Sequence, residues 1–397
     1  MALISIQLKS GYLTGLVDQK IPQEYELAGE IGRRFQLIGR MTYGAYLAKA
    51  SETAPTMSST GRRLRIGSAA APMTKKPSDA THFFKVSWPE DDRRLEGEII
   101  EEVRKRIRGL DEKHWSSVEK HIPLVKATAR VPGTSTAIIR IILGLPTAGS
   151  RSQYWMISKK LSGLSPILSD FNEFKRMYWE IIRCMSFPMP AHPSLIFSLG
   201  HRFLWNMGIS HGDISLNNLM YNPETRHGIL NDFDLASVME PSTQIPQTIG
   251  HRRTGTLVFM ASDLLKDDES IGGGVARRYY HELESFVWVL LWAGLSERNY
   301  RHKHILQWVD LTPTAVYEKK TTWIVDFRSK LAEMKTSESP YYDVLHSSLK
   351  ELALSVAVFS PENDEVRDVE FFTALTKAWT KQGEEWMGEV SFSMPQE

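Results

Sequence analysis

Residues 211–234 read HGDISLNNLMYNPETRHGILNDFD, and the rest of the chain can be arranged around them. They place Asp213, Asn218 and Asp232 in the pattern H-x-D-x-x-x-x-N, followed fourteen residues after the asparagine by D-F-x. Phosphoryl transfer needs a carboxylate that orients and deprotonates the attacking hydroxyl, and oxygen ligands for the Mg²⁺ that bridges the ATP phosphates. A hairpin over residues 220–230 would bring the second carboxylate back beside the first. The tripeptide HGD or NDF alone could occur by chance in a polar turn, but both together, in this order and at this spacing, are far more specific.

Composition sets the broad class. The 397 residues are 42% hydrophobic, enough for a two-lobed enzyme, and 48 basic residues balance 47 acidic ones, so charge indicates neither nucleic-acid nor membrane binding. The single Cys184 cannot form an intramolecular disulfide. The N-terminus lacks the pattern of a secretion signal, and the most apolar run, residues 286–295, is too short to span a bilayer. We expect an intracellular protein of the cytoplasm or nucleus, with its oligomeric state open.

Two stretches near the N-terminus suggest a phosphate-binding turn and a loop. Residues 35–50 (FQLIGRMTYGAYLAKA) predict strand, turn and strand, and fit G-x-G-x-x-G-x-V with Gly39 and Gly44 but Met41 in the middle. Outer glycines let backbone amides approach phosphate oxygens, although an ordinary hairpin turn explains the pattern equally well. Residues 51–81 are rich in Ser, Thr, Ala, Pro and Gly, which indicates a flexible insertion.

The next segment offers a lysine and its partner. Residues 82–88 (HFFKVSW) alternate as a strand with Lys85 in the middle, and Pro89 is expected to open a charged helix that runs to residue 109. Glu96 is the expected partner of Lys85, because it precedes two inward-facing isoleucines, and Glu98 is the competitor. For any single carboxylate of this helix, a solvated face is the simpler interpretation.

Further along, residues 137–145 and 153–157 predict two strands, and residues 158–161, beginning at Ser158, a hinge to a helical region. Helices are expected at residues 170–185 and 194–207, the second ending at Gly208 and leading into the catalytic loop. Residues 279–294 (YYHELESFVWVLLWAG) predict a buried helix, and the chain beyond residue 300 looks helical.

In this order, the pieces resemble the fungal-type protein kinases, a branch of the protein-kinase superfamily. The resemblance rests on GRMT, FKVSWP, HGDIS, ILNDFDLAS, RTGTLVFMA and HELESFVWVLLW, and covers residues 36–295. It implies a bilobal α+β fold: an N-lobe of residues 1–157, with an antiparallel sheet and one helix, and a mainly helical C-lobe of residues 158–397. The catalytic loop would be residues 211–218 and the activation segment residues 232–263. The implied cofactors are ATP and Mg²⁺, and the implied reaction transfers the γ-phosphate to Ser or Thr of an unknown protein substrate.

The same resemblance assigns roles to single residues. Asp213 would be the base, Lys85 would hold the phosphates with Glu96 fixing it, and Asn218 and Asp232 would bind metal. The remaining assignments are ATP contacts at Gly39, Gly44, Lys85 and Ser158; supports of the loop at His211 and Phe233; a hydrogen bond near Asp213 from Thr256; and a brace of the loop backbone at Glu282, where kinases usually have Asp.

Several positions depart from the kinase pattern. Gly212 replaces the arginine that usually receives an activation-loop phosphate, so we hypothesise activity independent of phosphorylation at four candidate sites: Ser237, Thr243, Thr248 and Thr254. Ser215 replaces the lysine that neutralises the γ-phosphate in serine/threonine kinases. Losing one positive charge beside the developing anion costs on the order of 3 kcal/mol unless another group takes its place. Asp234 replaces a glycine; in an extended segment its carboxylate would point the same way as that of Asp232, to a second Mg²⁺, or it would cap a turn. Ser262 and Asp263 stand where Pro and Glu are usual.

Two other functions stay open on sequence alone. A small-molecule phosphotransferase of the aminoglycoside- or choline-kinase type shares HGD without the lysine and the D-x-D pair, but lacks the G-T-x-x-F-M-A segment. A pseudokinase that scaffolds partners would explain the departures, whereas the retained carboxylate, metal ligands and lysine favour an enzyme.

Overall fold

The computed structural model describes residues 8–9, 12–13, 25–34, 42–49, 76–109, 116, 118–184, 204–205, 207–239, 255–266, 277–296, 305–358, 370–371 and 373–375. Several predicted features lie outside these residues: Gly39 and Met41, most of the insertion at 51–81, most of the helix at 194–207, and the hydroxyls of Thr243, Thr248 and Thr254. The chain divides into two compact units, one of residues 1–102 with 122–162 and one of residues 103–121 with 163–397. The expected lobe boundary at 157/158 thus falls five residues before the division at 162/163, and residues 103–121 group with the second unit.

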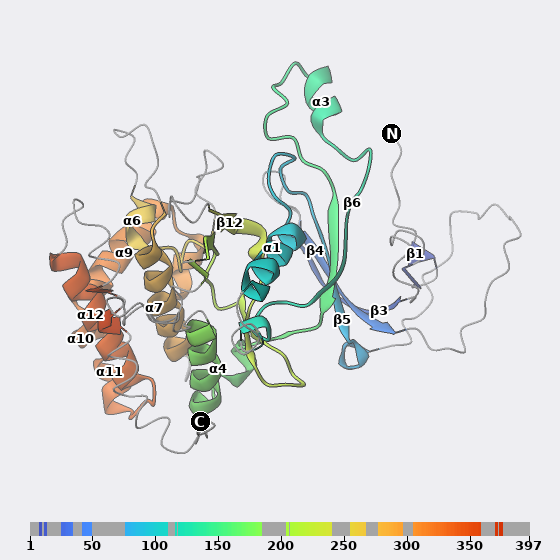
Figure 1. Ribbon diagram of the computed structural model, residues 1–397. Helices are drawn as coiled ribbons and strands as arrows, with labels where there is room; N and C mark the ends of the chain where they lie inside the picture. Colours follow the sequence, from blue (N-terminus) through green and yellow to red (C-terminus); the bar gives the residue numbers. More distant parts are fainter. Residues whose placement is uncertain are drawn as a thin grey trace, which may run out of the picture. The chain divides into compact units, whose positions relative to one another are not determined.

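The first unit is built on an antiparallel sheet (Figure 1). Seven strands of its described part follow the order β1-β2-β3-β4-β5-β7-β6. Lys85 of β5 pairs with Gly44 of β4 on one side and Met156 of β7 on the other, so the lysine occupies a central strand. The strands are β1 Leu8–Lys9, β2 Tyr12–Leu13, β3 Tyr25–Arg34, β4 Thr42–Lys49, β5 His82–Ser87, β6 Val125–Arg130 and β7 Tyr154–Lys159.

One face of this sheet carries the core of the unit. Phe84 and Val86 of β5 pack in one buried cluster with Leu47, Trp155 and Ile157 from the neighbouring strands. Successive side chains of a strand point to opposite faces, so the packing of residues 84 and 86 turns the residue between them to the other face. The core therefore fixes the direction in which Lys85 points.

The helix after β5 begins later than expected. Helix α1 spans Glu96–Arg108, whereas Pro89 leads into a bridge between Glu90 and Arg151 followed by a turn, so the helix predicted from Pro89 is wrong at its start. The backbone N–H of Leu95 donates to the Glu98 carboxylate at 3.0 Å. A glutamate at the third helical position that reaches back to the preceding N–H is half of a capping box and marks a helix start. Glu98 therefore caps α1.

Residues 137–145 are not a strand. Residues Ala137–Ile142 form helix α3, which Figure 1 shows beyond the end of β6, and none of its residues is buried. An apolar run of six residues that is interrupted by Arg140 is too short for its periodicity to separate a strand from a helix. The strand that pairs with β7 on the side away from β5 is β6, which the sequence does not mark clearly because two of its three half-buried positions are alanines. The second predicted strand, residues 153–157, is confirmed as β7.

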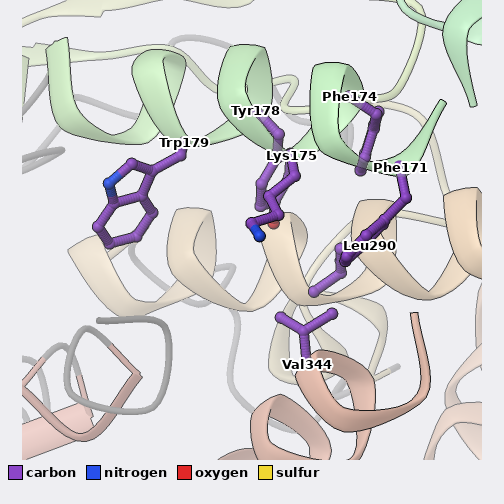
Figure 2. Close-up of a pocket in the computed structure, with 7 residues that line it drawn as sticks. All are labelled: Phe171, Phe174, Lys175, Tyr178, Trp179, Leu290 and Val344. Atoms are coloured by element: carbon purple, nitrogen blue, oxygen red, sulfur yellow. The ribbon is translucent and has the colours of Figure 1, made fainter. Parts of the chain in front are cut away.

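The second unit is mainly helical. Helix α7, Tyr279–Ser296, is buried through Leu295, as predicted, and the Tyr178 hydroxyl of α4 donates to the Phe286 carbonyl of α7 at 2.8 Å. Figure 2 shows side chains of α4 facing Leu290 of α7 and Val344 of α12 around a shallow pocket. No helix in the described ranges combines the length and apolarity that crossing a bilayer requires. Its larger helices are α4 Phe171–Cys184, α7, α9 Pro313–Val325 and α12 Tyr342–Val358, and the short ones are η2 Ser165–Ile167, α6 Ser262–Leu265, η5 Leu306–Asp310, α10 Phe327–Lys330 and α11 Ala332–Thr336.

Short strands of the second unit frame the predicted catalytic loop. Strands β10, Leu219–Tyr221, and β11, Gly228–Leu230, form the predicted hairpin with Leu219 opposite Leu230. Strand β9, Ile209–Ser210, pairs with β12, Ser237–Val238, on the far side of the 3-10 helix η3, Phe233–Leu235. Both ends of residues 211–218 and of residues 231–236 are thereby tied together. The remaining short elements are η1 Pro77–Asp79 and β8 Ser162–Gly163.

Candidate active site

Asp213 is held on both carboxylate oxygens. Its Oδ1 accepts a hydrogen bond from the Thr256 backbone N–H at 2.8 Å, and its Oδ2 accepts one from Asn218 Nδ2 at 3.1 Å. A carboxylate offers about four lone-pair positions, so two internal donors fix its orientation and leave acceptor capacity for a substrate hydroxyl. The predicted hydrogen bond from Thr256 is present, made by the backbone amide of that residue.

Asn218 has its amide orientation defined by the same contacts. Its Nδ2 also donates to the Asp213 carbonyl at 2.8 Å, so the opposite atom, Oδ1, is the one that can bind a metal. The Asn218 carbonyl accepts from the backbone N–H of Asn231 at 2.8 Å. This bond closes the hairpin one residue before Asp232.

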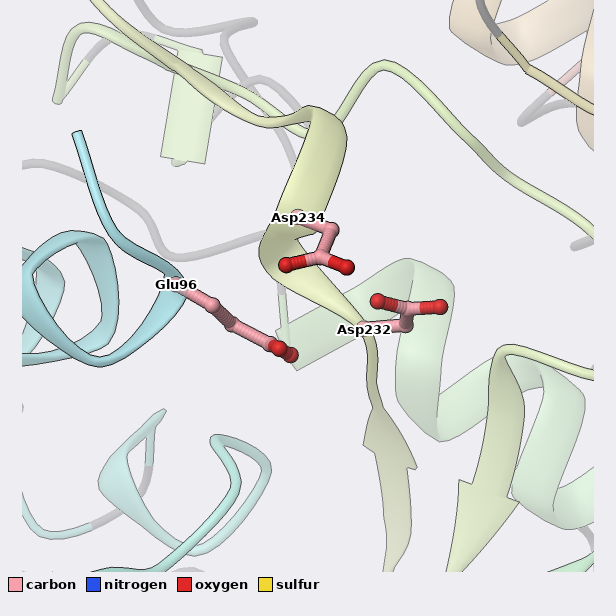
Figure 3. Close-up of side chains that lie close together, drawn as sticks. All are labelled: Glu96, Asp232 and Asp234. Atoms are coloured by element: carbon pink, nitrogen blue, oxygen red, sulfur yellow. The ribbon is translucent and has the colours of Figure 1, made fainter. Parts of the chain in front are cut away.

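Asp232 and Asp234 bring two carboxylates together (Figure 3). A carboxylate oxygen of each lies within 4.8 Å of one of the other. Asp232 has left-handed backbone angles, φ 66° and ψ 73°, and the next three residues form η3. The expectation of an extended segment is therefore wrong, because the chain turns at Asp232. A non-glycine residue in this region costs of order 1 kcal/mol or more, and such strain is concentrated at functional sites.

His211 links the catalytic loop to the residue before Asp232. Its Nε2 lies 3.0 Å from the Asn231 carbonyl and its Nδ1 lies 3.3 Å from the Asp213 backbone nitrogen. A carbonyl only accepts and an N–H only donates, so the imidazole is neutral with its proton on Nε2. Burial lowers the pKa of His211, which agrees with this form, although the carboxylates of Glu282, Asp213 and Asp232 oppose the shift. Its ring packs edge-on against Phe233 at 4.9 Å, the supporting contact that the sequence predicts.

In the first unit, Lys85 and Glu96 form a buried ion pair. Nζ lies 2.7 Å from Oε2, and the two side chains are 8% and 1% exposed. Glu96 projects from the first turn of α1 (Figure 3), and the next residue, Gly97, allows that turn to approach the sheet. A Cβ at Gly97 would lie 2.6 Å from both Thr128 Cγ2 and the Tyr154 hydroxyl. The pairing of Lys85 with Glu96 is as predicted.

Glu282 braces the loop as predicted. Its Oε1 accepts from the Ser210 hydroxyl at 2.7 Å and from the Gly212 N–H at 2.9 Å, and the residue is buried. Arg277, which the sequence analysis missed, donates from Nη1 to the Gly212 carbonyl at 2.6 Å. No motif marks this arginine, and only its position five residues before Glu282 could have suggested it.

A second group of missed residues holds the end of the activation segment. Glu284 Oε1 accepts from the Ser262 N–H and hydroxyl and from Trp288 Nε1, at 2.6 to 2.9 Å. Buried Lys320 donates to the Met260 carbonyl and lies over the Trp288 ring. Burial lowers the pKa of Lys320 to about 7, while Glu284 opposes the shift. Of the two residues that depart from the kinase pattern here, Ser262 is therefore held by Glu284, and Asp263 accepts a hydrogen bond from the Tyr280 hydroxyl at 2.8 Å.

The other predicted site residues are placed as follows. Gly44 lies inside β4 and Ser158 inside β7, so each belongs to a strand of the first unit and neither to a turn. Ser215 is buried in the catalytic loop. The structure gathers Asp213, Asn218, Asp232 and Asp234 in the second unit and Lys85 with Glu96 in the first.

These donor sets suit the expected ligands chemically. The Asn218 amide oxygen and the carboxylates of Asp232 and Asp234 are hard oxygen ligands of the kind that Mg²⁺ prefers. A buried ammonium held by a carboxylate suits phosphate oxygens. The oxygen ligands of the second unit therefore fit a divalent metal, and the ion pair of the first unit fits phosphate oxygens.

Comparison with known proteins gives a family match over part of the chain. Residues 199–293 match the family model described as fungal protein kinase. A comparison with curated proteins finds no significant match. Among solved structures, the chain is similar to the Cydia pomonella granulovirus kinase PK-1, at 12% identity over 66% of this chain and 67% of that one, with a TM-score of 0.34. The matched segment contains the catalytic loop, the hairpin and most of α7, and over these residues the chain is similar to the fungal protein kinases.

Proposed function

We propose that the chain is an ATP-dependent protein kinase that transfers the γ-phosphate to serine or threonine hydroxyls of a protein substrate. The observation that carries the proposal is the fixed carboxylate of Asp213, oriented by Asn218 and by the Thr256 amide. In this role Asp213 accepts the proton of the attacking hydroxyl, and its two internal hydrogen bonds keep the carboxylate directed at the acceptor.

The other residues supply binding. Asn218 Oδ1 and the carboxylate of Asp232 would hold Mg²⁺, with Asp234 for a second ion, and the metal would neutralise charge on the transferred phosphoryl group. Lys85, kept in place by Glu96, would bind the α- and β-phosphates. Ser215 offers no positive charge where kinases have lysine, so we expect slow turnover relative to kinases that retain it.

The activation segment favours a protein acceptor over a small molecule. Residues 255–262 are tied at one end to Asp213 and at the other to Glu284 and Lys320. A segment held at both ends beside the catalytic carboxylate is suited to support an extended peptide, a role that small-molecule phosphotransferases do not need. The intact Lys85–Glu96 pair and the positioned Asp213 argue against a scaffold without activity.

The test is transfer of labelled γ-phosphate from Mg²⁺-ATP to a generic basic protein, with an aminoglycoside and choline as parallel acceptors. We expect label on serine and threonine of the protein, at a rate that Asp213→Asn lowers by about 10²- to 10⁴-fold. Label on a small molecule alone would establish the phosphotransferase alternative. Equal label with the wild type and Asp213→Asn would reject the kinase assignment.

A further inference from the structure

Gly212 occupies a place where the chain has no room for a side chain. Its φ is +78°, in the left-handed region that favours glycine, and a Cβ there would lie 2.5 Å from the carbonyl oxygen of Leu235. The catalytic loop is therefore packed against the segment after Asp232 by its bare backbone. An arginine at this position could not be accommodated without moving one of the two segments.

A guanidinium nevertheless lies beside Gly212. Arg277 Nη1 lies 2.6 Å from the Gly212 carbonyl oxygen and 3.5 Å from the place that a Cβ of residue 212 would take. Arg277 comes from the segment before α7, far from the loop in sequence. Position 212 is thus supplied with a positive group by another part of the chain.

The carboxylates that act on Arg277 are those of Asp213 in the catalytic loop and of Glu282 in α7. Burial lowers the pKa of Arg277, and the carboxylates of Glu282 and Asp213 oppose that shift. Arginine remains protonated in proteins, so the guanidinium stays charged and is attracted by both carboxylates. Glu282 holds the N–H of Gly212 while Arg277 holds its carbonyl, and the two clamp the peptide units on both sides of this residue.

We propose that Arg277 is a positioning residue for phosphoryl transfer, which holds the Gly212 peptide and hence Asp213 in place without a phosphate on the activation segment. The inference rests on the proposed kinase function. It gives a physical basis for activity without loop phosphorylation, because the guanidinium is engaged by groups of the folded chain. A phosphoryl group on Ser237 or on a threonine of the segment is not needed to place it.

The test compares Arg277→Met with Arg277→Lys, with exposed Arg328→Met as the matched control in the same unit. Met removes the charge and the donor, whereas Lys keeps a charge and one donor for the carbonyl. We expect Arg277→Met to lower kcat at least tenfold with KM for ATP within about twofold, Lys to recover most of that loss, and the control to match the wild type. Rates are normalised to the fraction of protein that Mg²⁺-ATP stabilises in a thermal-shift titration.

Two further variants sharpen the result. Arg277→Met combined with Gly212→Arg should not recover the rate, because the new side chain meets the Leu235 carbonyl. Alanine at Ser237, Thr243, Thr248 and Thr254 together, or phosphatase treatment checked by mass spectrometry, should leave kcat within about twofold of the untreated wild type. Should Arg277→Met not fold, Arg277→Gln, which keeps an N–H donor and lacks the charge, takes its place.

Outcomes separate this inference from the proposed function. If the wild type shows no transfer that depends on Asp213, the kinase assignment fails. If transfer depends on Asp213 but Arg277→Met keeps at least half of the wild-type kcat, or phosphatase treatment abolishes activity, the role of Arg277 is overturned while the kinase assignment stands.

Discussion

The buried pair of Lys85 and Glu96 gives a prediction that needs no catalytic assay. Glu96→Gln would leave the Lys85 ammonium buried beside a neutral amide. A matched control exists in the same unit, because Glu90 and Arg151 also lie 2.7 Å apart but their side chains are 27% and 26% exposed. Glu96→Gln and the control Glu90→Gln each remove one carboxylate charge 2.7 Å from its cationic partner. They differ in the exposure of the glutamate side chain, which is 1% for Glu96 and 27% for Glu90.

The magnitude follows from this difference in burial. Removing one partner of a buried pair costs about 3–5 kcal/mol because the other charge is left uncompensated. Removing one partner of a half-exposed pair costs about 0–1 kcal/mol. The double variant Lys85→Met with Glu96→Gln leaves no buried charge and should recover most of the loss, to within about 1–2 kcal/mol of the wild type.

Hydrogen exchange of the β5 amides is the suitable assay, since the chain has two units and global unfolding need not be two-state. A loss of 3 kcal/mol corresponds to exchange about 100-fold faster in Glu96→Gln, against less than about tenfold in Glu90→Gln. Equal effects of the two single substitutions, or a double variant less stable than either single one, would refute the burial and pairing described for Lys85 and Glu96.

Three predictions concern buried groups of the second unit. His121 bonds through Nδ1 to the Gly228 carbonyl, and burial lowers its pKa to about 4. The pKa of His121 in the unfolded chain is higher, about 6.5, so the unfolded chain binds more protons between these two values. Stability that is fully present above pH 6.5 is therefore lost as the pH falls toward 4, by at most about 3 kcal/mol. Hydrogen exchange of the β11 amides, corrected for the intrinsic effect of pH, should show a smaller loss of stability between pH 7 and 4.5 in His121→Asn than in the wild type, and an equal loss would argue against the assignment. The pKa of Lys320, about 7 in the fold, lies below that of an unfolded lysine, so the folded chain binds fewer protons between those values and its stability rises with pH. The difference in unfolding free energy between the wild type and Lys320→Met should therefore move in favour of the wild type from pH 7 to 9.5, and a constant difference would contradict this. Glu282→Gln keeps an acceptor but removes the charge that faces Arg277; steady-state kinetics should show kcat lowered about tenfold or more, with KM for ATP little changed, and an unchanged kcat would count against the clamp on Gly212.

The sequence predicts those parts of the site that depend on local chemistry. The spacing of Asp213, Asn218 and Asp232 fixes a loop and a hairpin, because the polar turn after Tyr221 and the apolar strands on either side leave few other arrangements. The partner of Lys85 is also predictable, since Glu96 precedes the buried face of α1. In both cases the residues that contact one another lie within about 25 positions in the sequence, so their spacing alone indicates their geometry.

Contacts that depend on the tertiary fold are not predictable in the same way. Arg277 and Lys320 reach Gly212 and Met260 across 65 and 60 residues, and neither stands in a motif. Helix α3 lies where the sequence predicts a strand, because a run of five aliphatic residues interrupted by Arg140 suits either structure. The turn at Asp232 was missed because left-handed backbone in a non-glycine residue is set by the surrounding structure.

The central claim is that Asn218 and Asp232 hold a metal–nucleotide complex beside Asp213. Anomalous diffraction from crystals grown with Mn²⁺ and a non-hydrolysable ATP analogue tests it directly. We expect a manganese peak within about 2.0–2.6 Å of Asn218 Oδ1 and an Asp232 carboxylate oxygen, and no peak there in Asp232→Asn crystals. Nucleotide bound with manganese at other side chains, or the same peak retained in the variant, would contradict it.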